Sequence, residues 1–461
     1  MKNKLLAIII LAVTFLSCDD KLDLSPEDQL TLPVSFSNKT LALGVLNGIY
    51  SASQQDDVLN GTWQLAGEWQ SDNVNFVGSF PTFNELRTYT TLSDNTSISG
   101  MWDDRYESIG TANLVIKYVP LVEDPNFTDS ERANAIAQAK FMRALLYFDF
   151  ANWFSQPLQT GNGTTLAVPL VLEPFDGVVN YPSRATLNEV FAQVEQDLLS
   201  ALPNLDNTDN SKATRGACLA LLARLYLYQD RFPEAADYAN QAIQEGSFAL
   251  ASDYTFYDTV SNEFYFTLVN TAADGQDSGE GFSGLSNPTP GGRGDAPFSQ
   301  NLLDAFAAEP GDKRFTELTQ VGPDAIGNNS TFTSKFPEAV NNSDNAPVLR
   351  VTEMYLTRAE ANFRAGSSVG DTPLNDINAL RSRAGLSDLA SVDLDAILLE
   401  RRKELCFEGH RRMDLLRNNM NLRRAGMANV SESAPGQNKV ILPIPVNQLD
   451  LNENLTQNPG Y

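Results

Sequence analysis

The stretch that decides the fold is TRGACLALLARLYLYQDRFPEAADYANQAIQ, residues 214–244. Its apolar residues recur at helical spacing from Thr214 to Tyr228. A second helical pattern, EAADYANQAIQ, begins directly after residues 229–233. The stretch therefore predicts a helix, a short turn and a second helix.

A longer helix is predicted upstream of this pair. Thr128 and Glu131 form a T-x-x-E capping box, which is a start signal for a helix. Apolar residues then recur at helical spacing from Ala137 to Phe148. Together they predict a buried helix of more than about twenty residues.

The helix pair recurs near the carboxyl end. VTEMYLTRAEANFRAG, residues 351–366, has a helical pattern, and a further helix is expected around residues 373–384. Each pair resembles a tetratricopeptide unit, and stacked pairs bury their apolar faces only against their neighbours. The sequence therefore predicts a mainly α-helical protein, a tetratricopeptide-like repeat scaffold with long irregular loops and few short strands.

Two stretches lack helical periodicity. Residues 272–297 are rich in Gly, Ser, Asp and Pro, and residues 64–91 mix aromatic side chains with Asp and Asn. Both are predicted to be irregular. Because loops carry binding residues more often than helices do, these stretches are the first places to look for a ligand site.

The amino terminus has the layout of a bacterial lipoprotein signal peptide. Two lysines precede an apolar run from Leu5 to Leu16, and a small residue stands before Cys18. As a helix that run rises only about 18 Å, too little to cross a hydrocarbon core of about 30 Å, so cleavage and lipidation of Cys18 are expected. The predicted divisions are a signal peptide at residues 1–17, a lipid-attached tether at 18–33 and a single domain at 34–461.

Composition excludes several classes of function. The chain has 58 acidic and 33 basic residues and a net charge of −25, or −27 once Lys2 and Lys4 are removed with the signal peptide. A field of that sign repels nucleic acid and anionic headgroups and favours a neutral or cationic ligand.

His410 is the only histidine, which excludes His-rich zinc sites. Cys218 and Cys406 lie in apolar helical patterns and are predicted to be buried thiols, although a disulfide between them stays open.

An ordered set of motifs along nearly the whole chain resembles the SusD/RagB family of outer-membrane nutrient-binding lipoproteins. Besides Cys18 the motifs are WDDRYESIGTANLVI (102–116), KFMRALLYFDFANWF (140–154), ATRGACLALLARLYL (213–227), LRVTEMYLTRAEA (349–361), ERRKELCFEGHRRMDLLR (400–417) and ILPIPVNQLDLNENLTQNPGY (441–461). The resemblance implies a lipoprotein that caps a SusC-like TonB-dependent outer-membrane barrel and captures oligosaccharide for import, without catalysis. Acidic residues after Cys18 resemble the export signal of Bacteroidetes surface lipoproteins, which implies an outward-facing location on the outer membrane.

The segment at residues 400–417 has two explanations. Glu404 and Glu408 could act as an acid and a base, with His410 as a switch near its usual pKa of about 6.5. Alternatively, a charged network fixes the turn between two helices, with Gly409 in the left-handed conformation. Glu400, Glu404, Arg401 and Arg412 are the charges expected to pair across that corner. We favour the network, because the family resemblance implies a framework role for this segment.

A glycan site needs exposed aromatic rings beside groups that hydrogen-bond sugar hydroxyls. The candidates in the first loop region are Trp69, Asp72, Asn73, Asn75, Phe76, Phe80 and Phe83. The candidates in the Gly-rich loop, expected to approach a ligand from the opposite side, are Phe282, Asn287, Arg293 and Asp295. Burial of Trp69, Phe76 and Phe80 under the loop is the alternative, and Trp102 and Trp153 are expected in the core.

The predicted function is capture of oligosaccharide and its delivery to the barrel. The alternatives are binding of peptide or protein ligands for import, or a scaffold or adhesin without a small ligand. A surface glycoside hydrolase is disfavoured. No cofactor is predicted, and calcium at the Asp-rich tether or at DSGEG (277–281) is unsupported because neither matches the twelve-residue calcium loop.

Overall fold

The structure, a computed structural model, describes residues 31–274, 279 and 281–461. The predicted signal peptide, Cys18 and most of the tether lie outside the described residues, as does most of the DSGEG segment. Within the described part of the chain, no helix is both long and apolar enough to cross a membrane.

Helices dominate the chain, which confirms the predicted mainly α fold. The helices up to residue 243 are α2 (Leu32–Ser35), α3 (Lys39–Ser53), α4 (Thr62–Gln70), α5 (Pro81–Thr88), α6 (Thr96–Tyr118), α7 (Asp129–Phe154), α8 (Leu158–Gly161), α9 (Leu187–Ala201), α10 (Arg215–Tyr228) and α11 (Phe232–Ile243). The later helices are α12 (Phe282–Ser286), α13 (Gln300–Ala307), α14 (Lys313–Thr316), α15 (Val351–Ala365), α16 (Pro373–Arg383), α17 (Leu394–Leu405), α18 (Arg411–Arg417) and α19 (Val446–Leu451). The strands are β1 (Phe264–Leu268), β2 (Thr319–Pro323), β3 (Asn329–Thr333) and β4 (Ala346–Arg350), and the 3-10 helices are η1 (Val119–Leu121), η2 (Leu202–Asn204), η3 (Thr255–Asp258) and η4 (Asn438–Val440).

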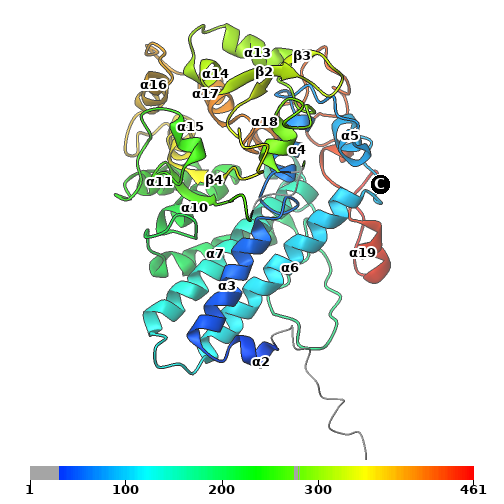
Figure 1. Ribbon diagram of the computed structural model, residues 1–461, viewed down its shortest axis with the longest axis vertical. Helices are drawn as coiled ribbons and strands as arrows, with labels where there is room; N and C mark the ends of the chain where they lie inside the picture. The colour runs from blue at the N-terminus through cyan, green and yellow to red at the C-terminus, as the bar shows by residue number, and fades with distance from the viewer. Residues whose placement is uncertain (1–30, 275–278, 280) are drawn as a thin grey trace, which may run out of the picture.

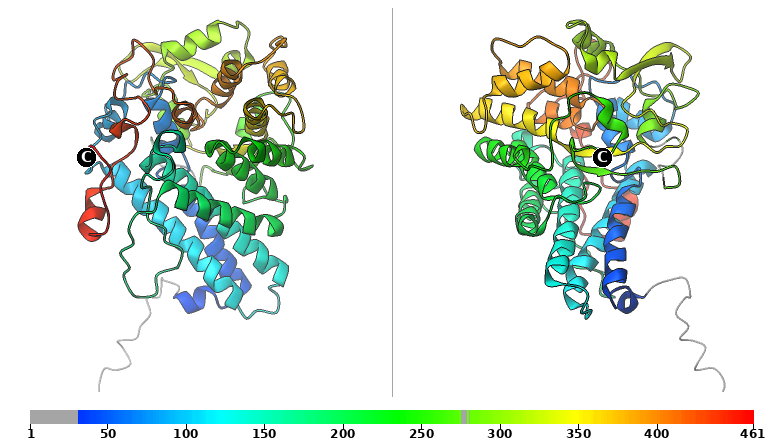
Figure 2. Two further views of the ribbon diagram at one scale, coloured as in Figure 1. Left: turned by 180° about the vertical axis from the view of Figure 1, so that it is seen from behind. Right: turned by 60° about the vertical axis from the view of Figure 1, so that its left-hand side comes forward.

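The long helices form one continuous row (Figures 1 and 2). In turn, α3 packs on α6, α6 on α7, α7 on α9, α9 on α10 and α10 on α11, and α15 then packs on α11 and contacts α16 and α17. The chain between α11 and α15 leaves this row and builds much of the upper half of Figure 1, including α13, α14 and the β2–β3 hairpin. The helix pairs α10–α11 and α15–α16 are the predicted tetratricopeptide-like units.

Local signals explain why the predicted helices form where they do. The Thr128 amide donates to Glu131 Oε2 over 3.0 Å and the Glu131 amide donates to Thr128 Oγ1 over 3.3 Å, so the capping box satisfies amides that the first turn of α7 leaves unpaired. Helix α15 ends at Gly366, whose φ of 64° is left-handed and suits glycine. Trp102 and Trp153 lie in the core, as predicted.

The irregularity expected over residues 64–91 is wrong. Helix α4 lies across the start of that stretch and α5 follows, while α12 lies within the Gly-rich segment. Helix α4 escaped prediction because nearly all its side chains are buried, which removes the alternation between apolar and polar faces. Pro81 begins α5, and Tyr89 ends it in the left-handed conformation.

The strands form two small antiparallel sheets. Strand β1 pairs with β4, which runs directly into α15. Strands β2 and β3 form a regular hairpin in which Thr319 lies opposite Thr333. The carboxyl-terminal segment then returns to α7, where the Leu442 amide donates to the Trp153 carbonyl over 2.8 Å.

Candidate functional site

The two candidate loop regions lie side by side, although they are far apart in the sequence. The Asn75 amide donates to the Pro297 carbonyl over 3.0 Å, and the Val77 amide donates to the Asp295 carbonyl over 2.9 Å. These main-chain bonds hold the segment before α5 against the end of the Gly-rich segment. The two candidate regions therefore meet in the folded protein.

One aromatic ring and one guanidinium meet on this surface. Phe80 is 39% exposed, and the Arg293 guanidinium carbon lies 5.3 Å from its ring centroid. The same carbon lies 5.7 Å from the ring of Phe83. Arg293 is oriented by Asp295, because its Nε donates to Asp295 Oδ2 over 2.7 Å. We call Phe80 and Arg293 the Phe80–Arg293 platform. The two residues are in contact, and not on opposite sides of a ligand as predicted.

The other aromatic candidates in this region are buried. Phe80 packs on Phe83 with ring centroids 4.9 Å apart, Phe83 packs on Trp69 at 4.8 Å, and Trp69 packs on Phe76 at 4.9 Å. Trp69, Phe76 and Phe83 are almost fully buried, so their expected role as exposed stacking surfaces is wrong. Their rings form the core beneath the loops, and Phe83 contacts both Phe80 and Arg293 of the platform.

Asp72 is an ion-pair centre and not a surface ligand group. It is buried, and its two carboxylate oxygens accept from Arg411 over 2.7 and 2.8 Å. Arg424 donates to it over 2.5 Å, and Arg402 lies 3.5 Å away. Although burial opposes ionisation, these arginines hold the pKa of Asp72 well below its usual range.

Asn73 and its neighbour Glu68 are also buried. Asn73 Nδ2 donates to Glu68 Oε2 over 2.6 Å, and Asn73 Oδ1 accepts from Arg402 over 2.7 Å, so both ends of the amide are occupied. Burial raises the pKa of Glu68 to about 7 against the opposing effect of the Asn73 hydrogen bond. Glu68 Oε1 finds no hydrogen-bond partner among the described residues.

The Gly-rich segment contributes little beyond Arg293. Phe282 is fully buried, with its ring centroid 4.5 Å from that of Phe336. Asn287 Nδ2 donates to the carbonyls of Ser283 and Phe336 over 2.9 and 2.6 Å, and its Oδ1 accepts from Gln320. Both are framework residues, contrary to prediction. Among the candidates, Asn75, Phe80 and Arg293 are left at the surface.

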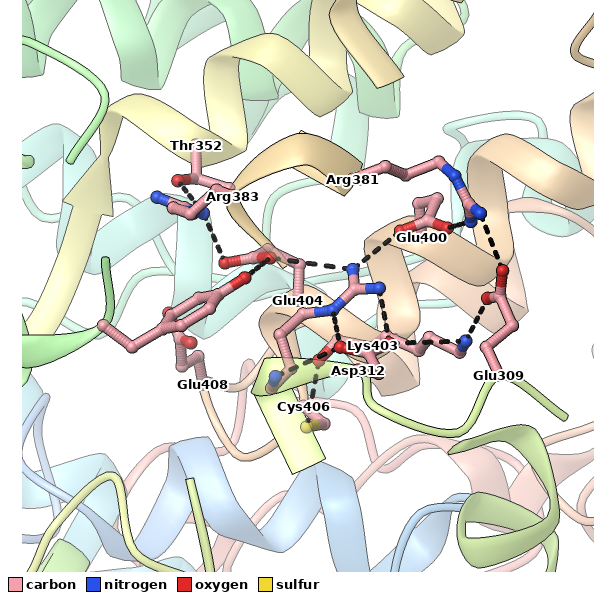
Figure 3. Close-up of polar contacts among 12 residues, drawn as sticks. Glu309, Asp312, Thr352, Arg381, Arg383, Glu400, Lys403, Glu404, Cys406 and Glu408 are labelled. Carbon is pink, nitrogen blue, oxygen red and sulfur yellow. Dashed lines mark hydrogen bonds and ion pairs between the residues drawn. The ribbon is translucent and has the colours of Figure 1, made fainter. Parts of the chain in front are cut away.

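The acidic side chains of residues 400–417 lie in a buried charge network (Figure 3). Glu404 accepts from Arg383 over 2.7 Å, and Glu400 accepts from Arg381 over 2.6 Å. Glu408 accepts from Lys335 over 2.6 Å and from Arg350 over 2.7 Å. The structure supports a charged network for this segment, but the expected pairing of Glu400 and Glu404 across the corner is wrong, because both accept from arginines of α16.

The surroundings of Glu404 and His410 each favour one charge state. Burial opposes ionisation of Glu404, but Arg383, Arg350 and Arg314 lower its pKa to about 2. Burial and nearby arginines hold the pKa of His410 well below 6.5, so this imidazole stays neutral. The expectation for Arg412 is wrong, since it donates to Gln70 and to the Asn152 carbonyl and not to a carboxylate.

The two cysteines within the described residues are buried. Cys218 and Cys406 are both free and buried, which confirms the prediction and excludes a disulfide between them. Within the described part of the chain, no group of three His, Cys, Asp or Glu side chains is placed to hold a metal ion.

Comparison with known proteins places this architecture. Residues 20–227 match a SusD-like family model described as "Starch-binding associating with outer membrane", and residues 326–461 match the model of the SusD family. The chain belongs to the SusD/RagB family. The first match runs from before α2 almost to the end of α10, and the second includes α15 to α19 and most of the buried charge network.

One curated relative matches the whole chain, and another matches a quarter of it. A SusD-like protein P2 from Formosa agariphila is 27% identical over the whole of both chains. The starch-binding protein SusD of Bacteroides thetaiotaomicron is 39% identical over 123 residues, which are 25% of this chain and 21% of that one.

Two solved structures share the fold. A SusD superfamily protein from Bacteroides thetaiotaomicron has a TM-score of 0.84 at 26% identity and covers 93% of this chain and 100% of its own. A laminarin binding SusD-like protein has a TM-score of 0.76 at 25% identity and covers 92% of this chain and 100% of its own.

Proposed function

We propose that this SusD protein is a cell-surface glycan-binding lipoprotein that captures oligosaccharide at the Phe80–Arg293 platform. The observation that carries the proposal is a half-exposed aromatic ring beside a guanidinium, at the junction of two segments joined by main-chain hydrogen bonds. The starch-binding description of the matching family model and the laminarin-binding relative support this ligand class.

The chemistry of the platform suits a neutral sugar. The exposed part of the Phe80 ring offers an apolar surface for the C–H face of a pyranose ring. Arg293 Nη2 has no hydrogen-bond partner among the described residues and can donate to a sugar hydroxyl, and Asn75, five positions before Phe80, is also exposed. The net charge of −25 disfavours an anionic polysaccharide.

The same surface supports binding without catalysis. Hydrolysis of a glycoside needs two carboxyl groups about 5 to 9.5 Å apart beside the scissile bond. Here Asp295 is bonded to Arg293 and Asp72 is buried among arginines, so neither is available as an acid or a base. The protein would bind its glycan and release it unchanged.

Lipidation at Cys18 after removal of residues 1–17 would hold the protein on the outer membrane, facing outward. From there it would pass its ligand to a SusC-like TonB-dependent barrel. The description of the matching family model as associating with the outer membrane supports this location.

The decisive test is a glycan panel against the chain that begins at residue 19, followed by affinity electrophoresis in the best ligand. Phe80→Ala is expected to weaken retention about tenfold, since each stacked ring contributes about 1 kcal/mol and the arginine contact is lost with it. Phe363→Ala is the matched control, because Phe363 is also 39% exposed but lies on α15. Equal retention by both variants would refute the platform. Binding of peptides and of no glycan would favour the peptide-binding alternative.

A further inference from the structure

An exposed apolar turn lies in the loop between α8 and α9. Phe175 is 70% exposed and Val178 is 64% exposed, and Val179 is similarly open to solvent. The Val178 amide donates to Asp176 Oδ1 over 3.0 Å, and Gly177 adopts a left-handed φ of 96°. The turn is therefore held by its own hydrogen bond while it presents three apolar side chains to solvent.

This turn lies at the end of the molecule where the described chain begins. In Figure 1 and in the left view of Figure 2, the teal-green loop that contains it descends to the level of α2. Lys117, near the end of α6, lies 3.2 Å from Glu173 in this loop. Phe36, directly after α2, packs on Tyr118 with ring centroids 5.4 Å apart. The loop, α2 and the end of α6 thus share one end of the protein.

Further apolar side chains are exposed at the same end. They are Leu32 and Val34 on α2 and Leu121 on η1. Soluble proteins rarely gather exposed apolar residues without a partner for them. Acidic residues at this end, among them Glu173 and Asp176, disfavour an anionic partner.

We propose that this end of the protein, formed by Leu32, Val34, Leu121, Phe175, Val178 and Val179 and here called the apolar tip, rests in the interface of a phospholipid bilayer. This proposal rests on the proposed lipidation of Cys18. Only residues 19–30 separate Cys18 from Thr31, so the acylated cysteine lies within about 45 Å of the tip even for a fully extended chain.

Contact through the tip would orient the glycan site. Helix α6 runs from the neighbourhood of α5, which follows Phe80, down to the apolar tip. Its 23 residues span about 35 Å at 1.5 Å each. The Phe80–Arg293 platform would therefore stand away from the bilayer, open to ligands from outside.

The test measures the depth of a fluorophore on the tip. Val178→Cys and Ile326→Cys are labelled with an environment-sensitive dye; Ile326 is the matched control because it is 65% exposed on the β2–β3 hairpin. The native Cys218 and Cys406 are buried and stay unlabelled in the folded protein. Each variant is placed on phosphatidylcholine vesicles, both as the lipidated full chain and as the chain from residue 19 held by an amino-terminal histidine tag on nickel-chelating lipid.

The emission of the dye at position 178 is expected to shift to shorter wavelength. Phospholipids spin-labelled near the headgroup are expected to quench this emission about twofold or more. The dye at position 326 is expected to show neither the shift nor the quenching. Equal behaviour of the two dyes would overturn the proposal. Shielding of position 178 from iodide only when the barrel is present, without quenching by lipid, would overturn it in favour of docking to the barrel. The nickel-anchored protein reports contact between the apolar tip and lipid even if Cys18 is not acylated. Neither form of the experiment depends on glycan binding.

A second measurement uses the unanchored chain from residue 19. Phe175→Ser, Val178→Ser and Val179→Ser together are expected to lower co-sedimentation with phosphatidylcholine vesicles about fivefold, with an unchanged melting temperature and no dependence on salt. Binding that rises with the fraction of anionic lipid would contradict an apolar contact.

Discussion

Replacing Glu68 with glutamine is expected to stabilise the protein at alkaline pH and not at acidic pH. Glu68 is fully buried, and burial raises its pKa from 4.5 to about 7. The folded protein therefore keeps the Glu68 proton more tightly than the unfolded chain does. This contribution to stability is complete below pH 4.5 and is lost as the pH rises through about 7.

The magnitude follows from the shift. The pKa of Glu68 rises from 4.5 to about 7, so its proton adds about 3 kcal/mol more to the free energy of unfolding below pH 4.5 than above pH 7. Glutamine cannot ionise, and its carbonyl can keep the hydrogen bond that Asn73 Nδ2 donates over 2.6 Å. Glu68→Gln should thus match the parent near pH 4.5 and exceed its stability by about 2 to 3 kcal/mol at pH 8.5.

Urea unfolding at half-unit intervals from pH 4.5 to 8.5 measures this difference. Glu107→Gln, at an exposed position on α6, is the control for removing one negative charge from a protein of net charge −25. A stability difference that stays constant across the pH range, or that Glu107→Gln reproduces, would refute the reasoning.

Four further predictions follow from the buried groups. Trp69→Ala should lower stability by about 3 to 5 kcal/mol in urea unfolding, because Trp69 lies within the stacked aromatic core and not on the surface; a near-neutral result would restore it as a ligand residue. Arg350→Met should cost about 3 to 5 kcal/mol in urea unfolding, because it removes one buried cation that Glu404 and Glu408 share and leaves their charges less compensated by Arg383 and Lys335. Burial opposes ionisation of Glu360 and Glu404, but nearby arginines lower both pKa values from 4.5 to about 2. The stability that these carboxylates add is therefore present above pH 4.5 and is lost as the pH falls toward 2. Circular dichroism should show that protonation of these two groups causes no unfolding of the protein above about pH 4.5. Cys218 and Cys406 should react with a thiol reagent only after denaturation, and fast labelling of the native protein would contradict their burial.

The helices with complete local signals were predictable from the sequence. Helix α7 has the Thr128–Glu131 capping box, and α15 is followed by Gly366 at its left-handed end. These signals lie within a few residues of the helix ends, so the chain alone reveals them. Helix α4 has no comparable signal in the sequence, because its burial on nearly all sides removes the polar face by which a helix is recognised.

The candidate site shows the same division. Composition alone marked residues 64–91 and 272–297 as unusual, and Phe80 and Arg293 were among the candidates. The sequence offered no means to separate Phe80 from Phe83, three positions away, although one ring is half-exposed and the other is buried. That difference depends on which side of α5 faces Trp69, which is a property of packing.

By itself the sequence determined the helical repeat scaffold, the family and the acidic surface, because helical periodicity, capping signals and ordered motifs are all local properties of the chain. Only the tertiary structure decided which polar and aromatic residues are free to bind. Asp72 and Asn73 look like ligand groups in the sequence, yet both are occupied by arginines of residues 402–424. The physical reason is that burial and charge pairing depend on contacts between segments more than three hundred residues apart, such as the 339 positions between Asp72 and Arg411.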